Sequence, residues 1–141
     1  LGWISDAERN LANIYLQMGR PDMAAGHQLE CLEWHLAIGE RWQTLGFLYG
    51  TCTTFPQLVG DDATAVSIMS FVYQNPDSFP SYRESIDENL PDFEQQMGSE
   101  TFASAWEKGE ALDFEKAEQM LREALAAAGN GAPSRQKELK E

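Results

Sequence analysis

The sequence predicts an all-α fold in which antiparallel helix pairs form an array that is closed by a C-terminal helical cap. Apolar residues recur every three or four positions along most of the chain, which is the spacing of a helix face rather than of a strand. A glycine turn at Gly19 is followed five residues later by Ala24, and the same pattern recurs 41 residues on at Gly60 and Ala65. The glycine turns the chain and the alanine lets two helices approach closely, so the repeat indicates a repeated helix pair.

The first pair follows from its stripe and its stop signals. An apolar stripe from Ile4 predicts a helix over residues 4–16. Gly19 is a natural left-handed helix end, and Pro21 suits the first turn of the next helix, where its missing N–H would be unpaired anyway. We expect that second helix over residues 22–38, ending at Gly39.

The second pair contains a proline in its first helix. That helix is predicted over residues 40–59, with a last turn bent or distorted by Pro56. Gly60 ends it, and Asp61 is placed to cap a fourth helix whose residues are mostly apolar. We therefore expect the fourth helix to be well buried, before a proline-rich loop over residues 75–80.

The closing segment predicts three capping helices. The fifth helix is expected over residues 81–97 with an interruption at Pro91, and Ser99 and Asp113 are expected to cap the sixth and seventh. The domain prediction is a single helical-repeat domain over residues 1–128, with two helix pairs in 1–75 and capping helices in 80–128 that cover the second pair. Residues 129–141 are predicted to be a flexible tail.

Composition and charge exclude several classes of protein. The formal net charge of −13 repels phosphate backbones, so we expect no direct nucleic-acid partner. No apolar run approaches the length of a membrane span, and we expect no membrane partner. Two cysteines are too few for a disulfide scaffold and fit a reducing cytoplasm, which is the predicted location. The chain begins at Leu1 rather than Met, so we expect it to be cut from a larger protein.

The first repeat resembles the tetratricopeptide pattern of large, small, glycine and alanine positions, which fall here at Leu11, Ala12, Tyr15, Gly19, Ala24 and Cys31. The 41-residue spacing exceeds the roughly 34 residues of that repeat, and it is similar to the longer helical arrays of bacterial signal-transduction ATPases, including LuxR-type transcriptional regulators. The closing segment strengthens this resemblance with Phe102, Ala105, Trp106, Gly109 and Leu112. The resemblance implies a tetratricopeptide-like α-α superhelix at the C-terminal end of a larger cytoplasmic regulator of signal transduction.

The resemblance also implies a partner-binding surface on the concave face, formed mainly by the first helix of each pair. The residues it places there are Asp6, Arg9, Asn13, Gln17, Gln43, Phe47 and Thr54. The expected partner is a protein, a peptide or the upstream domains of the same chain. The alternative is that these are ordinary solvated helix positions.

The sequence shows no catalytic motif and no phosphate-binding loop, so we expect a non-catalytic protein with no cofactor. His27, Cys31 and His35 share one helix face, yet they span two turns, and we expect a packed thiol between two histidines rather than a metal site. The tryptophans are expected to be core anchors, Trp106 above all.

An alternative function is a small-molecule sensor or a helical enzyme. It would use an apolar pocket between the third and fourth helices, lined by Phe47, Tyr49, Phe55, Phe71 and Tyr73. Finally, a missing upstream helix pair would leave apolar surface on the N-terminal pair, with Trp3, Ala7, Ile14 and Leu29 as candidates. We expect self-association there, as a two-fold dimer.

Overall fold

The structure is a computed structural model that describes residues 2–129, with side chains described from residue 7 onward. Within this range the chain forms seven α-helices, one short 3₁₀ helix and no strand, which confirms the all-α prediction. The elements are α1 (Gly2–Gln17), α2 (Pro21–Ile38), α3 (Arg41–Thr54), η1 (Pro56–Leu58), α4 (Asp62–Gln74), α5 (Pro80–Met97), α6 (Ser99–Glu110) and α7 (Phe114–Ala128). No helix in the described part of the chain has the length and apolar character to cross a membrane.

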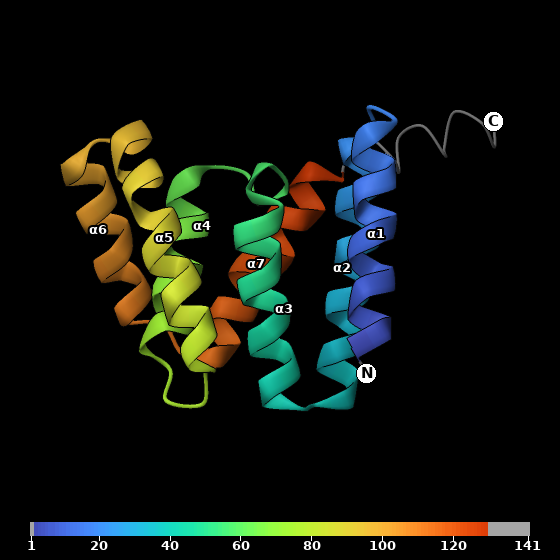
Figure 1. Cartoon of the computed structure of the whole chain (residues 1–141), viewed down its shortest axis with the longest axis horizontal. Coiled ribbons are helices and arrows are strands. Elements are labelled where there is room, and N and C mark those ends of the chain that lie inside the picture. Colours follow the sequence, from blue (N-terminus) through green and yellow to red (C-terminus); the bar gives the residue numbers. More distant parts are fainter. Residues whose placement is uncertain (1, 130–141) are drawn as a thin grey trace.

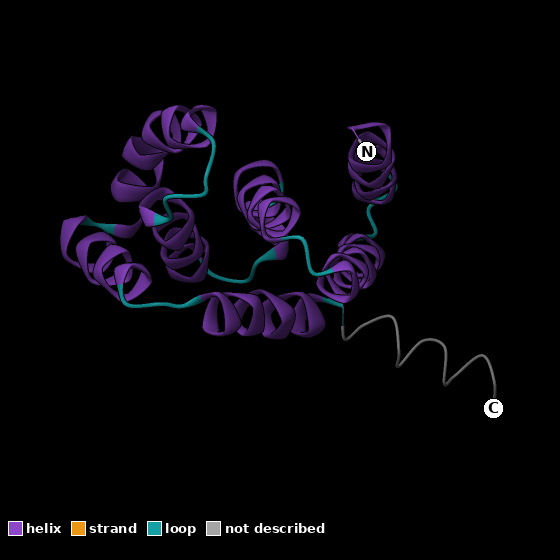
Figure 2. Cartoon of the chain, turned by 90° about the horizontal axis from the view of Figure 1, so that it is seen from below, coloured by secondary structure: helices purple, strands orange, loops and turns teal. Residues whose placement is uncertain are grey.

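The helices form two layers. Figure 1 shows α1 to α6 running alternately up and down across the molecule. Seen from below, α1, α3 and α5 form one layer and α2, α4 and α6 the other, while α7 lies across the outer side of the second layer (Figure 2). Helix α7 therefore does not cover the layer of α1, α3 and α5.

The helix ends follow local rules that the sequence predicts correctly. Gly39 ends α2 in the left-handed region at a φ of 78°, and its N–H donates to the His35 carbonyl at 3.1 Å. Asp61 caps α4 by accepting the Thr64 N–H at 2.8 Å, and Asp113 caps α7 with the same distance to the Lys116 N–H. The bond from Thr64 lowers the pKa of the Asp61 carboxyl, because it stabilises the charged form.

Three boundary predictions are wrong. The third helix stops at Thr54 instead of reaching residue 59, because Pro56 starts the separate helix η1. The fifth helix is continuous through Pro91. Pro91 and Asp87, whose carbonyl it leaves without a helical N–H, are both exposed, so water can replace the missing donor. Ser99 lies inside α6 rather than capping it, and its hydroxyl donates to the Glu94 carboxylate at 3.2 Å.

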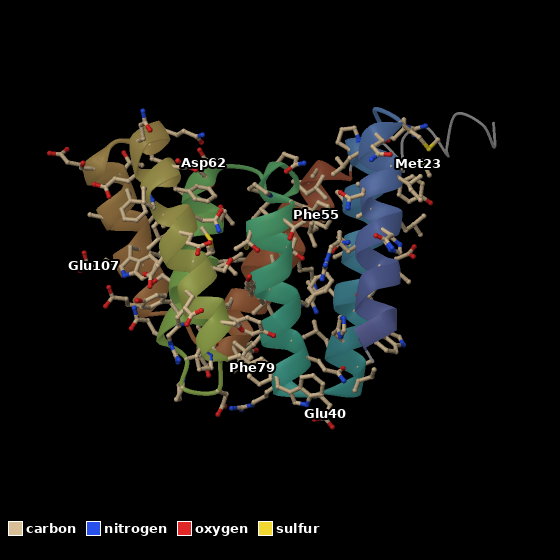
Figure 3. All side chains as sticks on the ribbon, viewed as in Figure 1. Met23, Glu40, Phe55, Asp62, Phe79 and Glu107 are labelled. Carbon is tan, nitrogen blue, oxygen red and sulfur yellow. The ribbon has the colours of Figure 1, made fainter. Side chains whose placement is uncertain are left out.

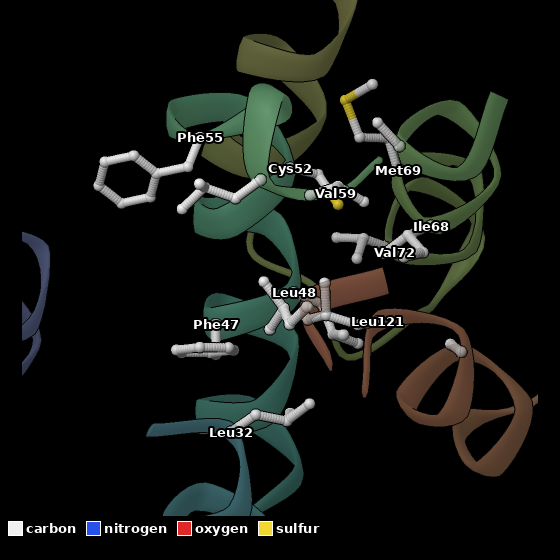
Figure 4. Packing of buried hydrophobic residues seen from close by; sticks show 14 of the residues in the cluster. Leu32, Phe47, Leu48, Cys52, Phe55, Val59, Ile68, Met69, Val72 and Leu121 are labelled. Carbon is white, nitrogen blue, oxygen red and sulfur yellow. The ribbon is translucent and has the colours of Figure 1, made fainter. Parts of the chain in front are cut away.

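The core lies where α2, α3, α4 and α7 meet, and Figure 4 shows part of it. The prediction that α4 is well buried is confirmed, since all eight residues from 65 to 72 are buried. Cys52 is fully enclosed in this core, and burial raises the pKa of its thiol. Figure 4 also shows Phe47 and Phe55 pointing to the other side of α3, toward α1.

The closing helices reach further than the sequence predicts. Helices α5 and α6 pack on α4, as expected of a cap on the second pair, but α7 packs on both α2 and α4. The Arg122 Nε lies 2.6 Å from Glu33 Oε1 on α2, and the Arg41 guanidinium lies 5.0 Å from the centre of the Phe114 ring. Gly129, the first residue of the predicted tail, is buried at the end of α7; the rest of that tail lies outside the described residues.

Candidate functional site

A groove of about 500 Å³ lies between α1 and α3 and continues to the start of α5. Its floor comes from α2 and α3, with Gln28, His35, Phe47 and Thr51. Glu8 of α1 and Gln43 of α3 stand on its two sides, and Tyr82 of α5 closes its far end. Figure 3 shows Phe55 in the same space, at the end of α3. The groove therefore opens on the layer that α7 does not cover.

The floor of the groove is polar although it is buried. Gln28 is 2% exposed and His35 is 5% exposed. The Thr51 hydroxyl donates to Gln28 Oε1 at 3.3 Å, and His35 Nε2 lies 3.3 Å from Glu8 Oε2. The His35 ring also packs on the Phe47 ring, with 5.2 Å between their centroids. These contacts join α1, α2 and α3 at one place.

Two buried polar atoms in the lining of the groove lack a partner among the described residues: His35 Nδ1 on the floor and Gln43 Oε1 on one side. A carboxylate only accepts hydrogen bonds, so the Glu8 contact places the ring proton of a neutral His35 on Nε2. Nδ1 then presents a lone pair, as does the carbonyl oxygen of the Gln43 amide. With His35 in this neutral tautomer, both unpaired atoms are acceptors, and buried acceptors cost free energy until they meet a donor.

The rim of the groove is aromatic. Trp34 and Trp42 are each 43% exposed, which makes the prediction that they are core anchors wrong for these two. At the α5 end, Tyr49 stacks on Tyr82 with 4.4 Å between the ring centroids. Gly46 allows this approach, because a Cβ there would lie 2.9 Å from the Tyr82 hydroxyl. Burial raises the pKa of that Tyr82 hydroxyl.

The partner-binding residues that the resemblance implied fall in different places. Arg9, Gln43, Phe47 and Thr54 line the groove. The other residues of the set that the structure describes, Asn13 and Gln17, lie further along α1 and do not belong to its lining. The side chain of Asp6 lies outside the described residues.

The aromatic pocket of the alternative function does not form between α3 and α4. Phe47, Tyr49 and Phe55 line the groove beside α1, α2 and α5. Phe71 instead packs on Phe114 of α7, and Tyr73 packs on Trp106 of α6. The five aromatic residues are divided because those of α3 and Phe55 face α1, α2 and α5, whereas those of α4 face α6 and α7.

The residues His27, Cys31 and His35, which share one face of α2, have different partners in the structure. Cys31 Sγ lies 3.6 Å from His27 Nε2, whereas His35 turns to Glu8 on α1. Burial raises the pKa of the Cys31 thiol to about 12, with a smaller effect from the Glu8 charge, so the thiol stays protonated at neutral pH. Within the described part of the chain, no group of three or more His, Cys, Asp or Glu residues is placed to hold a metal ion.

Several residues of the groove were not predicted, among them Glu8, Gln28 and Thr51. A signal existed for Gln28. Gln28 and His35 are seven residues apart, so they share the helix face that also carries Leu32, and polar residues on a buried face need partners. Glu8 gave no comparable signal, because its role depends on where α1 meets α2.

No family model, curated protein or solved structure matches this chain.

Proposed function

We propose that the chain is a tetratricopeptide-like protein-interaction module that binds a partner in the groove between α1 and α3 and performs no catalysis. The observation that carries the proposal is the lining of the groove. It combines half-exposed tryptophan rings at the rim with two buried acceptors that have no partner in the described part of the chain. Aromatic anchors beside buried polar groups are typical of the centre of a binding surface.

The helix arrangement supports a repeat module. The two glycine turns at Gly19 and Gly60 join successive helices, and both repeated alanines, Ala24 and Ala65, are fully buried. Arrays of helix pairs bind partners on the surface formed by the first helix of each pair, and the groove lies between two such helices, α1 and α3. The resemblance to signalling regulators supports a place at the C-terminal end of a larger cytoplasmic regulator, and its transcriptional role is proposed by analogy with LuxR-type regulators.

The second candidate is a small-molecule sensor. A volume of about 500 Å³ lies within the range of small-molecule sites, and two unpaired acceptors could orient a ligand. We favour a protein or peptide because the groove is lined from four helices and stays open along α3, instead of closing around one compartment.

The proposal is tested by NMR on the ¹⁵N-labelled chain, with the indole N–H signals of Trp34 and Trp42 as reporters. Pools of degenerate decapeptides and a panel of metabolites are titrated separately. We expect the peptide pools to shift both reporters and to leave Trp106, on α6, unchanged. Shifts produced by a metabolite alone would favour the sensor, and unmoved reporters in both series would refute a binding role for the groove.

A further inference from the structure

The lining of the groove contains two buried hydrogen-bond acceptors that receive no donor from the described residues. They are His35 Nδ1 and Gln43 Oε1, and His35 is more than nine-tenths buried. The carboxylate of Glu8 lies beside His35 and is itself mostly enclosed, with its side chain 14% exposed. A ligand that satisfies this set must bring several hydrogen-bond donors.

Charge favours a cation as that ligand. Glu8 places a carboxylate on the groove, and the chain carries a formal net charge of −13 that attracts cations over a longer range. The residue next to Glu8 in the lining, Arg9, is basic. It is exposed at the rim of the groove and is not part of the floor. The lining of the groove thus has two acceptors and the carboxylate of Glu8, which lies beside His35.

The rim favours the same kind of ligand. Trp34 and Trp42 expose large parts of their rings beside the groove. The face of an indole attracts the ammonium of lysine and the guanidinium of arginine, and guanidinium groups also stack on aromatic rings. Basic side chains carry three to five N–H donors and no acceptor, which matches the needs of the floor.

We propose that the groove receives a basic side chain, arginine or lysine, of a partner peptide. The cation lies against the Trp34 or Trp42 ring and donates to Glu8 and to the unpaired acceptors of His35 and Gln43. Both acceptor atoms are buried without the partner. The Gln43 residue is only partly buried, so its side chain can turn toward the entering cation. This inference rests on the proposed function, because it names the chemistry of the partner that the groove binds.

The test compares three pools of decapeptides that are uncharged and degenerate except at one fixed central position. That position holds arginine, citrulline or leucine; citrulline keeps the shape of arginine and loses its charge. We expect the arginine pool to bind about tenfold more tightly than either neutral pool. The indole N–H signals of Trp34 and Trp42 measure the binding. We also expect its affinity to fall as salt is raised, as for a charged encounter.

The outcomes separate this inference from the proposed function. Equal binding of the arginine and citrulline pools, with both indole signals shifted, would overturn the basic side chain and leave the groove as a peptide site. Unmoved indole signals with all three pools would overturn both. A lysine pool that binds like the arginine pool supports the inference, because both side chains supply the same cation.

A charge variant tests whether the basic side chain of the peptide contacts Glu8. Glu8→Gln retains an oxygen that can accept from His35 Nε2, so the fold should be kept, which circular dichroism checks. We expect it to weaken the arginine pool about five- to tenfold and to leave the leucine pool unchanged. The matched control is Glu107→Gln on the exposed face of α6, which removes the same charge far from the groove. Equal losses in the two variants would show a general charge effect and would overturn the assignment to Glu8.

Discussion

The contact between α4 and α6 and the groove between α1 and α3 use opposite kinds of side chains. At the first, Gly109 of α6 sits directly on α4: a Cβ at that position would lie 2.2 Å from the Ser67 carbonyl oxygen and 2.5 Å from the Ser70 Cβ. The hydroxyl of Ser67 donates to the Ala105 carbonyl and that of Ser70 to the Trp106 carbonyl, each at 2.8 Å. Small residues bring the helices together, and each of these hydroxyls has a partner.

The groove shows the reverse. Large rings such as Phe47 and Trp42 stand between helices that separate, and two buried acceptors have no partner among the described residues. Close packing with satisfied polar groups stabilises a fold and leaves a partner little to add. A wide space with unsatisfied groups does less for the fold and offers more to a ligand, which is why we place function at the groove.

The largest effect is expected from a substitution that disrupts the contact between α4 and α6. In Gly109→Ala the new methyl group meets a backbone oxygen, which moves only if a helix moves. We expect a loss of about 3 kcal/mol in the free energy of unfolding, the upper part of the range for overpacking. Urea denaturation measures it, with Ser104→Ala on the exposed side of α6 as a control that should change by less than about 0.5 kcal/mol. An unchanged midpoint for Gly109→Ala would mean that α4 and α6 lie further apart.

The second effect compares an aromatic ring of the cap with one of the rim. Trp106 is half-buried and packs against the core, with its ring 5.3 Å from the Tyr73 ring, so it holds α6 in place without being fully buried. We expect Trp106→Ala to cost about 2 kcal/mol, below the 3 to 5 kcal/mol of a fully buried ring. Trp42→Ala should cost about 1 kcal/mol or less in the same urea experiment, because its ring is more exposed. A larger loss for Trp42 would reverse the comparison.

What the sequence predicts well is local. The caps at Asp61 and Asp113 and the helix end at Gly39 depend on residues within one turn, so the sequence contains the whole cause. The burial of α4 could also be predicted, since most residues of that helix are apolar. These features gave the number and order of the helices.

What the sequence did not predict depends on how far apart two helices come to lie. Trp34 and Trp42 look like core residues in any list of apolar side chains, and they are half-exposed because α1 and α3 separate above them. The sequence places His35 on the same helix face as Cys31, but the ring nitrogen of His35 contacts the carboxylate of Glu8, 27 positions away. Pro91 was expected to break a helix, and the exposure of its neighbourhood made that unnecessary.

The third effect is a gain in stability on the groove side. Gly50 lies inside α3 on the groove, and a Cβ there would meet nothing within 4 Å. Gly50→Ala should therefore stabilise the protein by about 0.4 to 1 kcal/mol, mainly by restricting the unfolded chain. Gly46→Ala is the matched comparison, because its methyl group must displace the Tyr82 hydroxyl and should lose that gain. Thermal denaturation of both variants checks this, and a destabilised Gly50→Ala would show that the groove is narrower than described.

The smallest effect on folding concerns the surface of α1 at the end of the array, which packs on α2. Ile14 is 50% exposed and Met18, one turn further on the same face, is 65% exposed, while Leu29 of the predicted set is half-buried against the core. We propose that this face meets the same face of a second copy, since a two-fold contact lets one apolar patch cover another.

The test is Ile14→Glu. It should change the unfolding free energy by less than about 0.5 kcal/mol, as exposed positions do, yet convert a dimer to a monomer in light scattering at micromolar concentration. A monomer before the substitution, or a dimer that survives it, would each remove the contact from this face. Because the groove lies between α1 and α3, a monomeric Ile14→Glu should still bind the arginine pool, so the two surfaces are separable by one variant.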